Sequence, residues 1–235
     1  MPHDTAVAIH VGVGTLALLA YWFTLTTAKG TPRHRAAGKI SLALLLIVSL
    51  SVGPVLFWQP GPFDPRYAVQ MVYLVACVAT VSFLAVSAIR FRTRPDRFRG
   101  RHVAVLGPLL LGLGLVVLAA GIAKADPVAV TLSWVGLAFG SALIAFRRYQ
   151  GPLHSRWWLS WHLNATCALF NAVNGTVLYV LANRTGLVTE GAAAQTAFQL
   201  ATIGAAVAMR LWFGTKFKAP IRFGRKMTNA ALDPT

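Results

Sequence analysis

The chain makes its first turn at KGTPRHRAAGK, residues 29–39, a basic stretch that lies between two long apolar runs. Its Lys and Arg side chains surround one histidine, His34. Short loops rich in Lys and Arg stay on the cytoplasmic side of a membrane. If the flanking runs cross a bilayer, this stretch therefore fixes which way the chain faces.

Composition supports that reading. The 235 residues are 56% hydrophobic and 12% charged, whereas soluble domains are about 25% charged. The formal net charge of +16 resides in short loops, which excludes nucleic acid as the partner and favours membrane lipids, with anionic headgroups at the cytoplasmic face. Cys77 and Cys167 both lie in apolar runs, so no disulfide framework is indicated.

Seven apolar runs are long enough to span a hydrocarbon core, which takes about 20 helical residues. We expect an all-α integral membrane bundle of seven transmembrane helices within residues 1–214, followed by a basic cytoplasmic tail, 215–235. The expected helices cover residues 5–28, 39–58, 67–89, 103–123, 127–146, 158–182 and 192–213.

The distribution of Lys and Arg gives the orientation. Eighteen of them fall in alternate loops and the tail, three fall on the other side, and Arg210 lies inside the last run. The positive-inside rule then places the N-terminus outside and the C-terminus in the cytoplasm. We expect a multi-pass protein of the bacterial inner membrane.

Acidic residues are absent from the middle of every run, which disfavours proton-coupled pumps and carboxylate-based hydrolases. The sequence assigns no catalytic residue and leaves open whether the protein is an enzyme. Uncharged polar residues instead form stripes at helical spacing. They predict either interhelical hydrogen bonds or a polar pocket between the first, third, sixth and seventh runs, in which a non-enzymatic binder or transporter would hold a small amphipathic molecule. The pocket residues would be His10, Tyr21, Gln70, Tyr73, Asn171, Asn174, Gln195 and Gln199.

Four histidines, His34, His102, His154 and His162, fall at or near the cytoplasmic side in four separate segments. Imidazole is a common ligand of haem iron and zinc. One hypothesis is therefore a redox protein with haem b between His102 and His162, or a metal bound by His34, His102 and His154. The alternative is that these histidines fix turns and meet lipid headgroups.

Glycines recur on one face of two neighbouring runs: Gly107, Gly114 and Gly121, then Gly136 and Gly140. Small residues let helices approach closely. This face predicts either packing inside the bundle or an interface in a homo-oligomer. A third hypothesis is an accessory subunit that docks on a larger membrane complex through this face.

Three motifs carry a resemblance: HVGVG at 10–14, the KG-HR-GK pattern of 29–39, and HSRW at 154–157. In this order they resemble a bacterial family of predicted membrane proteins, domain of unknown function 2306. The resemblance covers about residues 1–40 and 147–182, departs at Trp158, where methionine is expected, and implies a functional set of His10, His34, Arg35, His154 and Trp157. A looser likeness is to membrane cytochromes of the b561 type, which pair histidines on a helical bundle; here it implies one haem.

Overall fold

The computed structural model describes residues 2–221 and 223–224. Within them the chain is helical, apart from turns and an isolated β-bridge between Leu153 and Gly224. Seven segments of this part are long and apolar enough to cross a membrane, with α6 and α7 together forming one, which confirms the number of spans. The helices are α1 (Pro2–Thr26), α2 (Pro32–Phe57), α3 (Pro65–Arg90), α4 (Pro95–Phe98), α5 (Arg101–Ala123), α6 (Pro127–Leu132), α7 (Trp134–Arg148), α8 (Trp157–Arg184) and α9 (Ala192–Lys216).

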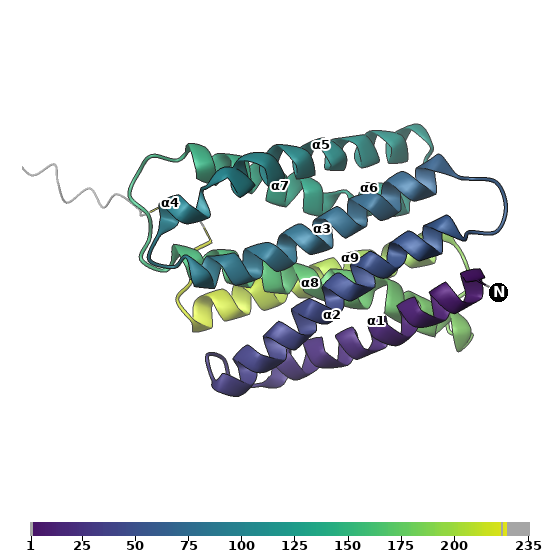
Figure 1. The fold of residues 1–235 in the computed structure, drawn as a ribbon, viewed down its shortest axis with the longest axis horizontal. Coiled ribbons are helices and arrows are strands. Elements are labelled where there is room, and N and C mark those ends of the chain that lie inside the picture. The colour runs from purple at the N-terminus through teal and green to yellow at the C-terminus, as the bar shows by residue number, and fades with distance from the viewer. Residues whose placement is uncertain (1, 222, 225–235) are drawn as a thin grey trace, which may run out of the picture.

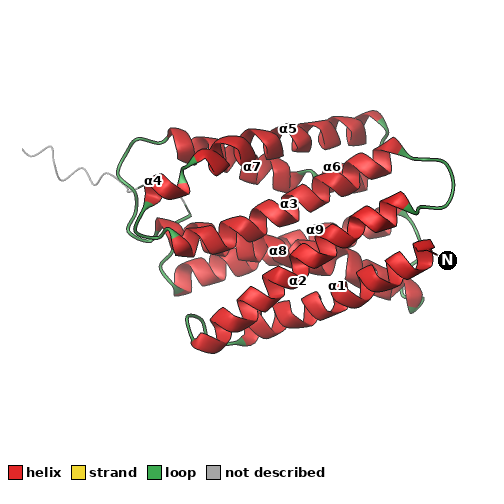
Figure 2. Cartoon of the chain, in the orientation of Figure 1, coloured by secondary structure: helices red, strands yellow, loops and turns green. Residues whose placement is uncertain are grey.

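The long helices lie side by side in three groups (Figures 1 and 2). α1 pairs with α2 as a hairpin, α3, α8 and α9 form the middle, and α5 packs against α6 and α7. One end of the bundle, on the left in Figure 1, holds the α1–α2 turn, α4, the α7–α8 loop and the end of α9. Most Lys and Arg residues of the described chain lie there, and we call it the basic end.

The second helix begins at Pro32, seven residues before the predicted start at 39. Thr31 is its N-cap: the hydroxyl accepts a hydrogen bond from the His34 backbone N–H at 3.2 Å, and Pro32 occupies the first turn, where no N–H is needed. The basic stretch is therefore a short turn followed by two helical turns. The hydropathy pattern missed those turns because they are polar, and the other predicted boundaries lie within three residues of the observed ones.

The fifth span, predicted as one helix over 127–146, is broken at Ser133. The hydroxyl of Tyr73 (α3) accepts from the Gly136 backbone N–H at 2.9 Å and lies 3.1 Å and 2.9 Å from the Leu132 and Ser133 carbonyl oxygens, to which it donates. A side chain inserted in this way separates a carbonyl from the N–H four residues later. Gly136 permits the approach, because a Cβ there would lie 2.9 Å from the Tyr73 ring.

The glycine faces of α5 and α7 pack against each other. A Cβ added at Gly114 would lie 3.1 Å from the Gly136 Cα, and one added at Gly140 would lie 2.5 Å from the Leu111 backbone nitrogen. These glycines therefore bring two helices of one chain together. This packing does not test whether the protein forms a homo-oligomer or is an accessory subunit. It does show that the glycine face proposed as the interface is covered within the chain.

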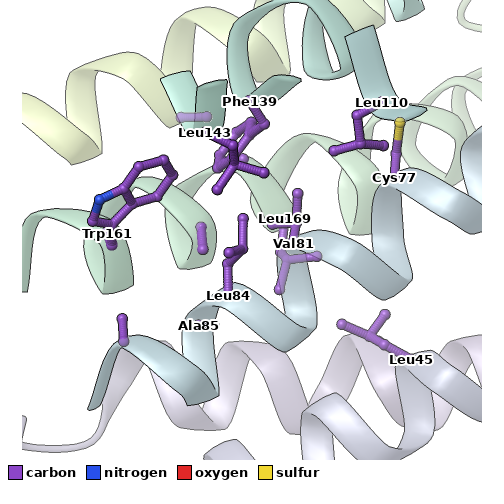
Figure 3. Packing of buried hydrophobic residues seen from close by; sticks show 14 of the residues in the cluster. Leu45, Cys77, Val81, Leu84, Ala85, Leu110, Phe139, Leu143, Trp161 and Leu169 are labelled. Atoms are coloured by element: carbon purple, nitrogen blue, oxygen red, sulfur yellow. The ribbon is translucent and has the colours of Figure 1, made fainter. Parts of the chain in front are cut away.

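The apolar core lies where the three groups meet. Figure 3 shows Val81 and Leu84 of α3 beside Leu169 of α8, with Leu143 of α7 above them; all four are at most 2% exposed. Lipid is as apolar as leucine, so close packing rather than removal from water holds such a core together. This rigid centre fixes the positions of the polar side chains on α3, α8 and α9.

The helical bundle extends two residues past the predicted limit of 214, because α9 ends at Lys216. The described residues after it fold back onto the start of α8, and we call 217–221 with 223–224 the C-terminal strap. Its Phe223 carbonyl accepts from the His154 backbone N–H at 2.9 Å, and its Pro220 carbonyl accepts from the Ser160 hydroxyl at 2.6 Å. The rest of the predicted tail lies outside the described residues.

Candidate functional site

Polar side chains meet in the middle of the bundle and bind one another. The Asn171 amide (α8) donates to Gln199 Oε1 and Thr202 Oγ1 of α9, both at 2.8 Å, and its Oδ1 accepts from Trp134 Nε1 at 3.3 Å. Gln199 donates in turn to Thr176 Oγ1 at 3.2 Å. We call these five residues the polar network. They form the interhelical hydrogen bonds that the sequence allowed as the alternative to a pocket.

The space beside this network is small. A cavity of about 40 Å³ adjoins Asn171 and Cys77 between α3, α6, α7 and α8. A water molecule needs about 10–15 Å³ of such volume, whereas ligand pockets measure about 300–1,000 Å³. The cavity therefore suits a few waters, and an amphipathic molecule does not fit in it.

Two predicted pocket residues join α1 to α8. The Tyr21 hydroxyl donates to the Thr166 carbonyl at 2.9 Å, and the Asn174 Oδ1 accepts from Trp22 Nε1 at 3.0 Å. The Asn174 amide also donates to the carbonyl of Phe170, one turn earlier, at 2.9 Å. These contacts hold the α1–α2 hairpin to the middle of the bundle.

The remaining predicted pocket residues lie apart from the network. His10 Nδ1 is 2.8 Å from Ser51 Oγ, so it links α1 to α2. Tyr73 breaks the fifth span, and Gln70 and Gln195 are half-buried near the starts of α3 and α9. The structure therefore brings together Asn171 and Gln199, and places His10, Tyr21, Asn174 and Tyr73 at three other interfaces.

The predicted haem ligands His102 and His162 lie on different sides of α3. The His102 ring lies 5.0 Å from the ring of Phe83, whereas His162 Nδ1 donates to the Ala85 carbonyl at 2.8 Å. Two positions along a helix are about 200° apart. Among the described residues no three His, Cys, Asp or Glu side chains gather in a way that could hold a metal.

The other two histidines complete backbone turns. His154 Nδ1 accepts from the Arg156 backbone N–H at 3.0 Å before α8. His34 Nδ1 donates to the Thr24 carbonyl at 3.2 Å, at the end of α1. Of the four predicted to converge, His34 and His162 come close enough to interact electrostatically.

Four basic side chains gather between the α1–α2 hairpin and the α8–α9 pair: Lys29, His34, His162 and Arg210. His162 interacts with His34 and Lys29, and Cys167 lies in electrostatic range of Lys29 and Arg210. All four residues are half-buried. We call this set the cationic cluster.

Arg210 is the deepest cation of α9. Its Nε donates to Asn164 Oδ1, and its Nη2 donates to Ser160 Oγ at 3.1 Å and to the Pro220 carbonyl at 2.7 Å. Its Nη1 is enclosed beside Gly214 and has no hydrogen-bond partner. All the acceptors are neutral, so the guanidinium charge is uncompensated by them, and in a low-dielectric setting such a charge attracts an anion.

Lys29 adds a second charge where α1 ends. Its Nζ donates to the Thr24 carbonyl at 3.2 Å and to the Leu25 carbonyl, and it lies 5.4 Å from the centre of the Phe213 ring of α9. The last carbonyls of a helix have no partner within the helix and favour cations. Burial, with Lys216 nearby, nevertheless lowers the pKa of Lys29.

Comparison with protein-family models, with curated proteins and with solved structures found no match. The resemblances to domain of unknown function 2306 and to b561-type cytochromes stay predictions. The case for a site therefore rests on geometry and charge.

Sequence reasoning located Arg210 inside the last apolar run but gave it no role. The signal was present, because a charge inside a membrane helix marks a functional site by default. Asn164, a polar residue inside the sixth apolar run, is its partner across the α8–α9 interface. Lys29 was interpreted only as an orientation signal, and nothing local to it indicated that it reaches α9.

Proposed function

We propose that the protein is a non-enzymatic binder or carrier of a small amphipathic anion in the bacterial inner membrane. Its N-terminus would lie outside and its basic end in the cytoplasm, as the positive-inside rule favours. The observation that carries the proposal is Arg210, a half-buried guanidinium with neutral partners and one donor nitrogen unpaired. An anionic head group supplies the acceptor that the unpaired nitrogen of Arg210 lacks.

The surroundings of the cationic cluster favour a ligand with an apolar tail. Leu211 and Trp212 of α9 are 49% and 58% exposed, and Phe23 of α1 is 58% exposed. In a bilayer these faces contact acyl chains. A ligand whose head group meets the cluster while its tail lies among lipids needs no enclosed pocket, which agrees with the small cavity volume.

Haem binding is the weaker candidate. Two axial histidines must reach one iron, and His102 and His162 contact different sides of α3. An absorption spectrum of the isolated protein tests it directly. A Soret band that is lost in His162→Ala would favour haem binding over the binder proposal. A spectrum without a Soret band would exclude haem in the isolated protein and leave the binder proposal unchanged.

The binder proposal is tested with a photoreactive analogue of palmitate in protein-containing nanodiscs, compared with the matching long-chain alcohol. We expect cross-links from the carboxylate probe to peptides of α8 and α9 near Asn164 and Arg210. Arg210→Gln should lower carboxylate labelling by about tenfold, because a charge-assisted hydrogen bond contributes about 1.5–3 kcal/mol. The alcohol should label both proteins equally.

Arg184→Gln is the matched control. Arg184 has the same charge and lies in the last turn of α8, at the end of the bundle opposite the basic end. The carboxylate probe should label the Arg184→Gln variant to the same extent as the unchanged protein. Equal losses in both variants, or equal labelling by acid and alcohol, would refute an anion site at Arg210.

A further inference from the structure

Donors without acceptors occur at a second place at the basic end, around the rings of Phe98 (α4) and Phe146 (α7). Arg99 Nε and Nη2, His102 Nε2 and Trp161 Nε1 are all enclosed and have no hydrogen-bond partner. The Arg99 guanidinium carbon lies 4.7 Å from the centre of the Phe146 ring, and the Trp161 ring lies 5.5 Å from it. The His102 ring lies 6.4 Å from Phe98, which is itself 5.6 Å from Phe146.

Such atoms call for an explanation, because leaving a buried donor unpaired costs about 1–3 kcal/mol. The contact of Arg99 with the Phe146 ring is a cation–π interaction and supplies no hydrogen-bond acceptor. The in-plane N–H groups at its edge still lack acceptors. Trp161, at 3% exposure, has no access to solvent that could supply one.

The unpaired atoms of Arg99 have a specific chemistry. Nε and Nη2 point along one edge of the guanidinium, and this edge binds the two oxygens of a carboxylate or phosphate at once. An indole N–H and an imidazole N–H are further donors to oxygen. Arg99 and Trp161 can therefore donate to the same kind of ligand, and His102 Nε2 joins them when that nitrogen carries a proton.

We propose that Arg99, Trp161 and His102 form a second binding site, which takes a phosphate or carboxylate group at the basic end. The site shares no residue with the cationic cluster and does not depend on its function. Phe223 of the C-terminal strap lies 4.9 Å from Phe146, so the strap packs against the same ring as Arg99.

The test uses the full-length protein in nanodiscs of phosphatidylcholine with a small fraction of phosphatidylglycerol, and counts the retained anionic lipid by native mass spectrometry. A second arm titrates inorganic phosphate calorimetrically into discs of phosphatidylcholine alone. We expect Arg99→Gln to weaken binding in one of these arms by about tenfold and Trp161→Phe by about threefold, since each loses donors to a charged group. Trp161→Phe keeps an aromatic ring in the core.

Arg97→Gln is the matched control, because Arg97 is exposed on α4, two residues before Arg99, and its loss changes the net charge equally. It should change binding by less than about twofold. Arg99→Lys keeps the charge but not the two-pronged edge, and should behave like Arg99→Gln.

Binding of phosphatidylglycerol would identify a lipid headgroup as the ligand, and binding of inorganic phosphate a free anion; either supports the site. Equal effects of Arg97→Gln and Arg99→Gln, or full binding by Arg99→Lys, would overturn it. Labelling by the palmitate analogue should be unchanged in Arg99→Gln. The proposals for the two sites can therefore be confirmed or refuted independently.

Discussion

The polar network and the basic end contain the same kinds of polar group but differ in how these are paired. In the network the amides of Asn171 and Gln199 find partners on neighbouring helices, and both residues are at most 3% exposed. At the basic end Arg99 and Arg210 keep enclosed nitrogens without acceptors. The network is paired within the described chain, whereas these nitrogens of Arg99 and Arg210 have no acceptor in it.

Whether a polar group is paired therefore distinguishes structural from functional residues better than polarity alone does. A fully paired network positions helices and has no free donor or acceptor for a ligand. Unpaired cationic donors raise the free energy of the isolated protein and lower it when a ligand binds. Variants in the network should therefore change stability, and variants at the basic end should change binding.

The largest effect is expected from Asn171→Leu. It removes one amide that serves three side chains, and leaves Gln199 Oε1 buried and the Trp134 N–H half-buried, both without these partners. We expect the free energy of unfolding to fall by about 2–3 kcal/mol. Reversible unfolding in mixed detergent and dodecyl sulfate micelles measures this.

Asn183→Leu is its control. Asn183 lies on the same helix but makes one hydrogen bond, to the Val188 carbonyl at 3.4 Å. Its loss should cost less than about 1 kcal/mol. An Asn171 variant that unfolds no more easily than the Asn183 variant, or one that is stable but loses the palmitate probe, would reverse the assignment of the two regions.

A pair of glycines gives the next largest effect. A Cβ at Gly175 would overlap the Gln199 amide, and one at Gly214 would overlap the Arg210 guanidinium. Gln199 is 2% exposed and fully paired, so Gly175→Ala should cost about 1–2 kcal/mol. Arg210 is half-buried and can shift, so Gly214→Ala should cost about 0.5 kcal/mol or less but weaken labelling by the carboxylate probe. Equal stability losses from both variants would show that the two regions are equally rigid.

A smaller effect is expected at the broken span. Tyr73→Phe removes the hydroxyl between the Leu132 carbonyl and the Gly136 N–H and should cost about 1 kcal/mol. Amide hydrogen exchange of Gly136 should become faster. Tyr179→Phe serves as control, because that hydroxyl accepts from the Gly191 N–H near the bundle surface. If the Gly136 amide exchanges at the same rate in both variants, Tyr73 does not hold the break.

The helices could be predicted because length and hydropathy determine them. The early start of α2 was also predictable, from Thr31 and Pro32, but by capping rules rather than by hydropathy. The break at Ser133 was not predictable from the local sequence, because the side chain that causes it, Tyr73, lies 60 residues away. Contacts of this kind depend on which helices become neighbours, and no local pattern specifies that.

The candidate site was predictable only in part. The sequence put Asn171 and Gln199 in polar stripes and assigned them either to interhelical hydrogen bonds or to a pocket. In the structure the two side chains bond each other, since two polar faces in lipid must meet. Depth along the helices suggested that four histidines converge, but the direction in which each side chain points differs. His102 and His162 lie at a similar end of the bundle yet contact different sides of α3.

The smallest effect concerns Lys29 and pH. Because burial lowers the pKa of Lys29 in the folded protein, the unfolded chain binds more protons in the interval between the lowered and the ordinary lysine pKa. The free energy of unfolding should therefore rise slightly as pH rises through this interval. Binding of the carboxylate probe should change in the opposite direction, because the attracting charge is lost.

Lys29→Met, which keeps the aliphatic chain, should remove both slopes, and Lys124→Met, at an exposed position where α5 ends, should remove neither. Opposite slopes that vanish together would show that one ammonium both costs stability and attracts the ligand. If Lys29→Met removes the stability slope but the pH dependence of binding persists, Lys29 only caps α1. Binding of the head group then depends on Arg210 with its partners Asn164 and Ser160, and the comparison between a paired interior and an unpaired basic end narrows to α8 and α9.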